Sequence, residues 1–262
     1  MRYRLLAVVL GCALAASLPV QAGLIGFYPF EGNILDSSGM GNHGTFGPTA
    51  PSLTASGYEG SAYQFGLAGA NTYLTVPINI NPSAMPALTM GAWVNAAIAD
   101  SVIRGIVSHD DGGFDRSLGV DTRGTCASLP CWSAFRQGTV LSSNITVQTG
   151  QWVFLAVRYD QVGKTVTLNV DGAQFQQTNQ TLGSSARTIT TIGRNPGYDS
   201  PFVGAIDNVF FFNEVLSDSQ VNAIRVGGAN AILSTAAVPE PGTVVLFGIG
   251  LAALMAFRRR CS

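Results

Sequence analysis

The stretch GQWVFLAVRYDQVGKTVTLNVDG, residues 150–172, decides the fold class of this 262-residue chain. Two runs rich in β-branched and aromatic residues, 151–160 and 164–172, lie on either side of a short connection that contains a glycine. Such runs, bounded by turn-forming residues, are typical of β-strands. The dipeptide Asp171-Gly172 then predicts a tight hairpin turn into a further strand, because this pair tolerates the positive φ angles that such a turn requires.

Similar short segments recur on both sides of this hairpin. They are β-branched or aromatic, and Gly, Asn, Asp and Pro bound them. No helix separates them, so the pattern predicts an all-β fold, an antiparallel β-sandwich rather than a parallel α/β sheet. The expected strands are 23–30, 62–66, 72–78, 87–95, 104–109, 116–121, 131–137, 151–160, 164–172, 173–177, 188–194 and 202–213.

One helix is expected near the end of this body. In LSDSQVNAIRVGG, Ser217 is a candidate N-cap and Gln220 follows it by three residues, the spacing of a capping box. Gly227 and Gly228 are expected to end the helix. Residues 228–237 are small and featureless and are interpreted as a linker. The residues expected to pack on the sandwich are Leu216, Val221 and Ile224.

Both ends of the chain indicate addressing segments. Residues 1–22 combine two arginines, an apolar stretch and small residues before Ala22, which indicates a secretory signal peptide cleaved after Ala22. At the other end, residues 242–257 carry no charge. As a helix they would span about 24 Å, a little less than the roughly 30 Å hydrocarbon core of a bilayer. Because long arginine side chains after the span can reach the interface, we expect a transmembrane helix in the inner membrane. The arginines that follow, expected on the cytoplasmic side, are Arg258, Arg259 and Arg260.

The order of features in residues 238–262 is specific. A Pro-Glu-Pro motif precedes the apolar helix, and the arginine cluster follows it; the motif residues are Pro239, Glu240 and Pro241. This order resembles the PEP-CTERM sorting signal of Gram-negative bacteria. The resemblance implies transient anchoring in the inner membrane, processing near the motif by the membrane enzyme exosortase, and release to the cell surface or the extracellular matrix.

The composition of residues 23–237 excludes some classes of function. This body has nine Lys+Arg, fourteen Asp+Glu and a single lysine, Lys164, so it has no basic face for a nucleic acid. Cys126 and Cys131 are five residues apart, and in an exported chain we expect them to form a disulfide. A zinc site would need two more ligands, and the two histidines do not have metal-ligand spacing.

Five blocks of this body, taken in sequence order, resemble a known domain family. Their order is similar to that of the LamG-like, concanavalin A-like jelly-roll domain, which we assign to residues 23–227. The resemblance implies two curved antiparallel sheets, and many such domains bind calcium and carbohydrate. The blocks are 27–47, 62–77, 87–95, 150–172 and 202–224.

The resemblance implies a structural calcium site between the 36–44 loop and the last strand. The matching positions are Asp36, Asn42 and Asp207, and backbone carbonyls would complete the six to eight oxygens that calcium prefers. Asp207 also draws attention by itself, because its strand is too apolar to bury an unpaired carboxylate cheaply. The alternative pairs Asp207 with backbone N–H groups or an arginine and leaves Asp36 as an ordinary turn residue.

Candidate sugar-binding residues lie in two loops and one strand. A carboxylate cluster and the loop RNPGYD supply hydrogen-bonding groups, and two aromatic side chains could stack on a sugar ring. The carboxylate cluster could also form a second calcium loop, and the alternative for both loops is a plain solvated loop. The candidates are Asp110, Asp111, Asp115, Trp132, Arg194, Tyr198 and Asp199.

The motifs of common hydrolases and phosphate-binding enzymes do not occur in the sequence. There is no E-x-D-x-x-E arrangement, G-x-S-x-G elbow, H-E-x-x-H helix or P-loop. We therefore expect a non-catalytic carbohydrate-binding or adhesion module, sorted to the cell surface or to an exopolysaccharide matrix. The alternatives are a structural matrix protein without a specific ligand and a hydrolase that acts on glycans.

Overall fold

The computed structural model describes most of the body that the sequence predicts. The expected signal peptide, residues 1–22, and the expected sorting signal, residues 238–262, lie outside the described residues. No helix within the described ranges is long and apolar enough to cross a membrane. These ranges are 23–109, 116–123, 126, 129–136, 138–180, 186–195, 197 and 199–236.

The first of two sheets, which we call sheet A, has eight strands. They are β1 (Leu24–Tyr28), β3 (Ser52–Thr54), β4 (Ala62–Phe65), β6 (Ala87–Ala96), β11 (Trp152–Asp160), β12 (Thr165–Val170), β13 (Ala173–Gln177) and β16 (Gly204–Phe212). Their order is β13-β12-β11-β6-β16-β4-β3, and β1 pairs with β16 outside this path. All of these pairs are antiparallel.

Sheet B also has eight strands. They are β2 (Thr45–Phe46), β5 (Leu74–Val76), β7 (Arg104–His109), β8 (Arg116–Asp121), β9 (Cys131–Arg136), β10 (Thr139–Thr146), β14 (Thr190–Ile192) and β15 (Ser200–Pro201). Their order is β10-β9-β8-β7-β14-β5-β2, and β15 pairs with β7 in parallel. A short 3-10 helix, η1 (Leu67–Gly69), follows β4. The predicted antiparallel jelly-roll sandwich is thus confirmed.

The core lies between the two sheets, and strand alternation builds it. Along β6, Met90, Ala92 and Val94 enter the main core cluster, while Trp93 belongs to a second cluster on the opposite side of the strand. This is the period of two expected for a strand with different environments on its two faces. Since both faces of β6 are largely buried, sheet A is the central layer of the molecule.

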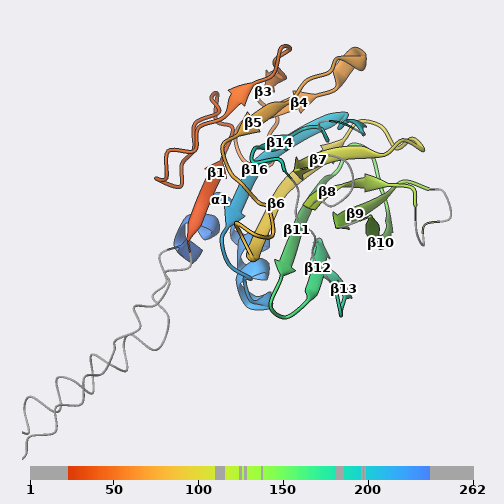
Figure 1. The fold of residues 1–262 in the computed structure, drawn as a ribbon. Coiled ribbons are helices and arrows are strands. Elements are labelled where there is room, and N and C mark those ends of the chain that lie inside the picture. The colour runs from red at the N-terminus through yellow and green to blue at the C-terminus, as the bar shows by residue number, and fades with distance from the viewer. Residues whose placement is uncertain are drawn as a thin grey trace, which may run out of the picture. The chain divides into compact units, whose positions relative to one another are not determined.

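The third layer is the helix α1 (Asp218–Ala236), which covers part of the outer face of sheet A. Figure 1 shows α1 beside β1 and β16. The predicted capping box is confirmed: the Gln220 N–H donates to Ser217 Oγ at 3.3 Å, and the Ser217 N–H donates to Gln220 Oε1 at 2.8 Å. The residues expected to pack on the sandwich are buried as predicted; they are Leu216, Val221 and Ile224.

The interpretation of residues 228–237 as a linker is wrong for the part that the structure describes. The chain kinks at Gly228, with φ 56° and ψ −143°, and then continues as a helix to Ala236. The N–H of Ala229 donates to Glu59 Oε2 at 2.8 Å. The helix therefore bends at Gly228 instead of ending there, and Glu59 caps its second segment.

The hairpin that decides the fold class forms as predicted. β12 and β13 pair up to Val170 and Ala173, and only Asp171 and Gly172 lie between them. Their φ angles are 48° and 95°, so both residues are left-handed, as the favoured two-residue hairpin turn requires. β11 pairs with β12 on one side and with β6 on the other, which places this hairpin at one edge of sheet A.

Candidate functional site

The Asp36 loop is held together by hydrogen bonds of its own. Asp36 Oδ1 accepts from the N–H of Phe27 at 3.0 Å and of Ser38 at 2.8 Å, and its Oδ2 accepts from the N–H of Asn42 at 2.9 Å. The amide of Asn42 in turn donates to Ile25 O at 2.7 Å. Asp36 therefore fastens this loop to β1.

Asp207 is fully buried in β16, and backbone groups surround its carboxylate. Oδ2 accepts from the N–H of Glu59 at 3.0 Å, and Oδ1 accepts from the N–H of Asn208 at 2.7 Å. Burial raises the pKa of this carboxyl to about 7, against the lowering effect of those N–H donors. The alternative that pairs Asp207 with backbone N–H groups is the one that the structure shows.

This geometry does not fit a calcium ion shared by Asp36, Asn42 and Asp207. The two carboxylates take donors from different segments, and the Asn42 side chain is used as a donor to a carbonyl. Within the described residues, no group of three or more His, Cys, Asp or Glu side chains gathers as a metal site would require. We derive no role for a metal from these residues.

The structure places the seven candidate sugar-binding residues in very different surroundings. Trp132 is only 1% exposed and belongs to the main core, so its proposed role as a stacking platform is wrong. The alternation of β9 turns it inward together with Ala134. Four candidates lie outside the described residues; they are Asp110, Asp111, Asp115 and Tyr198.

The remaining two candidates, Arg194 and Asp199, lie in the connection from β14 to β15. The Arg194 guanidinium stacks over the Tyr73 ring at 5.7 Å. Asp199 Oδ2 accepts a hydrogen bond from the side-chain amide of Asn195. This part of the loop is thus stabilised by local contacts, and the two candidates contact different partners.

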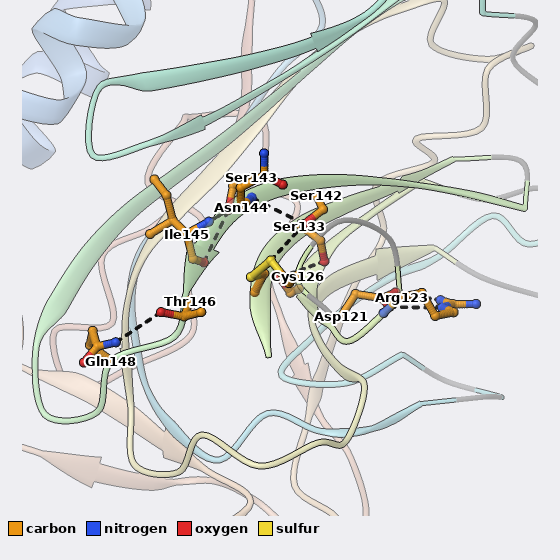
Figure 2. The surroundings of a disulfide bond; sticks show 12 residues. Asp121, Arg123, Cys126, Ser133, Ser142, Ser143, Asn144, Ile145, Thr146 and Gln148 are labelled. Carbon is orange, nitrogen blue, oxygen red and sulfur yellow. Dashed lines mark hydrogen bonds and ion pairs between the residues drawn. A yellow bond between two sulfur atoms is a disulfide. The ribbon is translucent and has the colours of Figure 1, made fainter. Parts of the chain in front are cut away.

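The expected disulfide between Cys126 and Cys131 is confirmed. The Cα atoms are 6.3 Å apart, inside the range that a disulfide can bridge. Figure 2 shows the bond beside Ser142 of β10, whose Oγ lies 3.3 Å from Cys126 Sγ. The bond therefore ties the β8–β9 connection down onto its neighbouring strands.

An aromatic cluster that the sequence analysis did not single out lies on the outer face of sheet A. The Tyr58 ring stacks on Trp93 with centroids 4.7 Å apart, and it meets Trp152 edge-on at 6.4 Å. Trp93 is buried, whereas Tyr58 is 37% exposed and Trp152 is half-buried. Tyr58 and Trp152 therefore present aromatic surface to solvent on a rigid support.

Strand register extends this cluster into a row of side chains. Trp152 pairs with Asn95, Asn95 with Ala205, and Ala205 with Gln64, so the four residues cross β11, β6, β16 and β4 in one line. Adjacent strands are about 4.8 Å apart, which makes the line roughly 14 Å long. We call the surface formed by these four residues and Tyr58 the Trp152 face.

The Trp152 face combines aromatic rings with amides that are not used inside the protein. Gln64 Oε1 is buried without a hydrogen-bond partner. The half-buried amide of Asn95 makes no hydrogen bond to another residue in the described part of the chain. The alternation Trp93-Val94-Asn95 predicts that Trp93 and Asn95 share a face, but the sequence does not show that Tyr58 and Trp152 join them.

Two family models match the sequence. A model described as the concanavalin A-like lectin/glucanases superfamily matches residues 68–222, and a model of the PEP-CTERM protein-sorting motif matches residues 237–260. The second match marks the chain for export-related sorting to the cell envelope or surface. No curated protein matches the sequence significantly.

Several solved structures share the fold. Domain 4 of AbnA, an extracellular arabinanase from Geobacillus stearothermophilus solved with arabinotriose, has a TM-score of 0.61 at 20% identity, covering 77% of this chain and 97% of that domain. The binding domain of Paraclostridial Mosquitocidal Protein 1 has a TM-score of 0.61 at 15% identity, covering 78% and 52%. Trypanosoma rangeli sialidase gives 0.56 at 13%, covering 78% and 33%. At these identities the similarity establishes the fold alone.

Proposed function

This chain belongs to the concanavalin A-like lectin/glucanases superfamily, and we propose that it is an exported, non-catalytic module that binds an extracellular polysaccharide. The observation that carries the proposal is the Trp152 face, where solvent-exposed aromatic surface lies beside the half-buried amide of Asn95. A similar domain was solved in complex with arabinotriose, which is consistent with this class of ligand.

The chemistry of the Trp152 face suits a neutral sugar chain. An aromatic ring offers a flat apolar surface on which the C–H side of a sugar ring can lie, and its gain comes largely from buried area. Amides both donate and accept, so the half-buried Asn95 can satisfy sugar hydroxyls that lose water on binding. Tyr58 needs little ordering, because stacking on Trp93 already fixes its ring.

The non-catalytic part of the proposal is supported by the use that the structure makes of its carboxylates. A retaining glycosidase needs two carboxyl groups about 5 Å apart, one of them free to attack the sugar. Asp36, Asp207 and Glu59 instead accept hydrogen bonds from backbone N–H groups. Through these hydrogen bonds the three carboxylates hold loops and a helix in place.

The sorting motif supports the proposed location. We infer that a C-terminal helix anchors the chain transiently in the inner membrane and that exosortase then releases it to the cell surface or matrix. Binding polysaccharide at that location would make the module an adhesive or matrix component. The expected ligand is the exopolysaccharide of the cell that exports the protein.

Affinity electrophoresis of the full chain, in detergent, through gels containing the host exopolysaccharide, arabinan or dextran tests the function. We expect at least one polymer to retard the protein, with no increase in reducing ends on incubation. Tyr58→Ala and Asn95→Ala should each weaken binding about tenfold, which corresponds to about 1.4 kcal/mol.

The matched control is Phe46→Ala. Phe46 is 38% exposed, much like Tyr58, but it lies on β2 of sheet B. The control variant should bind as the wild type does. No retardation by any polymer would leave a structural matrix protein as the better description, and release of reducing ends would establish a hydrolase.

A further inference from the structure

A second candidate site lies close to the Trp152 face. A pocket of about 420 Å³ is lined by residues from three segments of the chain. Its size falls within the range of small-molecule pockets. The residues that the argument uses are Gly66, Ala68, Ile98, Arg104, Pro201 and Val203.

The pocket lies just beyond the ends of three strands that carry the Trp152 face, where Gly204 pairs with Phe65 and with Ala96. Gly66 lies two residues beyond Gln64, Val203 lies two residues before Ala205, and Ile98 lies three residues beyond Asn95. Because a fully extended chain covers about 3.3 Å per residue, these separations are at most roughly 7–10 Å. A chain of sugars that crosses the Trp152 face could therefore end in the pocket.

The polar group of the pocket is a fixed arginine. Arg104 Nε and Nη2 donate to the two carboxylate oxygens of Asp100 at 3.0 and 2.6 Å, and Nη1 donates to Pro201 O at 2.8 Å. The charge of Arg104 is therefore already balanced. A negatively charged ligand would have to approach Asp100 as well, and like charges repel.

The rest of the lining is mainly apolar and partly strained. Ala68 has φ 53°, an uncommon left-handed conformation for a residue with a Cβ, and it follows Gly66 with φ 65°. Strained backbone of this kind gathers at ligand clamps. Ile98 in the lining and Val102 nearby in the sequence are each 37% exposed, so apolar surface is available at this end of the sandwich.

We propose that the pocket receives the terminal unit of the bound glycan and that this unit is an uncharged 6-deoxy sugar. The methyl group at C5 of such a sugar matches the alanine, isoleucine, proline and valine side chains of the lining. This inference rests on the proposed glycan-binding function and adds the identity of the chain end.

The test uses two sets of methyl glycosides, of galacto and manno configuration, whose C5 carries a methyl, a hydroxymethyl or a carboxylate group. Calorimetry with the full chain measures each affinity. We expect the methyl members to bind at least about tenfold more tightly than the carboxylates, and also more tightly than the hydroxymethyl members. Ile98→Trp, which fills the pocket, should abolish this binding, whereas the matched control Val102→Trp should not change it.

The outcomes separate this inference from the proposed function. The inference is overturned if the methyl members bind no more tightly than the hydroxymethyl or the carboxylate members, or if binding is unchanged in Ile98→Trp. If polysaccharide binding still depends on Tyr58 in either case, the proposed function stands without it. If the glycosides bind and Ile98→Trp blocks them while no polysaccharide binds, the pocket assignment holds and the polysaccharide function falls.

Discussion

The carboxylate of Glu59 accepts a hydrogen bond from the N–H of Ala229, 170 residues later in the chain, at 2.8 Å. The same oxygen, Oε2, accepts from the side-chain amide of Asn208 at 2.7 Å. One acidic side chain thus joins the β3–β4 connection to β16 and to the second half of α1. Its negative charge also lies at a helix N-terminus, where the helix dipole favours it.

Glu59→Ala should lower the free energy of unfolding by roughly 2 kcal/mol, since it removes a helix cap and leaves the Asn208 amide without its acceptor. Glu59→Gln keeps one acceptor oxygen and loses the charge, so about half of that loss is expected. Urea unfolding of both variants measures the two effects. Equal stability of the alanine variant and the wild type would show that the contact contributes nothing.

Gly228→Ala should be more damaging than its position in a helix suggests. Gly228 has φ 56°, and a Cβ there would lie 2.2 Å from Glu59 Oε1. We expect a loss of about 3 kcal/mol, part from the backbone conformation and part from displacing the cap.

Gly150→Ala is the control for this substitution. Gly150 has φ 75°, but a Cβ there would meet nothing within 4 Å. It should therefore lose only the conformational part, about 1–2 kcal/mol. Equal losses at Gly228 and Gly150, measured by the same urea titration, would argue against a specific conflict with Glu59.

The free energy of unfolding should depend on pH because of Asp207. Its pKa is about 7 in the folded protein, against an ordinary value of 3.8. The folded state therefore binds the proton more tightly than the unfolded state, and the resulting stabilisation is full below about pH 4. That contribution is lost as the pH rises through about 7, and the total change is on the order of 4 kcal/mol. Asp207→Asn cannot titrate, so the difference in unfolding free energy between wild type and variant should shift in favour of the variant between pH 4 and 8. Parallel pH profiles would contradict the burial effect.

The sequence predicted which segments are strands better than it predicted which residues contact one another. All twelve expected strand segments contain strands, because alternation and turn residues act locally. Four strands were missed: the two- or three-residue strands β2, β3 and β15, and the longer β10. Ser142, Ser143 and Asn144 make the middle of β10 polar, and it is a strand because β9 pairs with it. Its register shifts between Ser142 and Thr146, and Asn144 has φ 59°, which breaks the period that a sequence pattern needs.

The candidate site was less predictable, for a physical reason. Trp132 and Trp152 are both strand tryptophans, and only the stacking of sheets and helix decides that the first is 1% exposed and the second half-exposed. The contact between Tyr58 and Trp152 joins positions 94 residues apart. Likewise, the continuation of α1 beyond Gly228 depends on Glu59, whose position no local pattern near the helix reveals.

The disulfide should make a measurable but modest contribution. The loop that Cys126 and Cys131 close is short, and a loop of this length restricts the unfolded chain by about 2 kcal/mol. The double variant Cys126→Ser/Cys131→Ser should lose about that much in urea unfolding. Peptide mass spectrometry of exported wild-type protein should find both cysteines in one cross-linked peptide; free thiols at these two positions would contradict the assignment.

The last prediction concerns calcium, because the family resemblance implies a bound ion whereas the structure shows its expected ligands engaged in hydrogen bonds. The resemblance implies an ion held by Asp36, Asn42 and Asp207, and such an ion would stabilise the fold by about 2.7 kcal/mol at a hundredfold excess over its dissociation constant. In the structure Asp36 is engaged by its own loop and by β1, and Asp207 by the N–H groups of Glu59 and Asn208.

We therefore expect the melting temperature of the full chain to be the same in millimolar calcium and in chelator. Asp36→Asn should still lower it in both conditions, because an amide cannot accept from all the N–H groups that now share the carboxylate. A fall in melting temperature on chelation that Asp36→Asn and Asp207→Asn both remove would overturn this prediction. It would show that the 36–44 loop and β16 rearrange around an ion, with both carboxylates exchanging N–H donors for the metal.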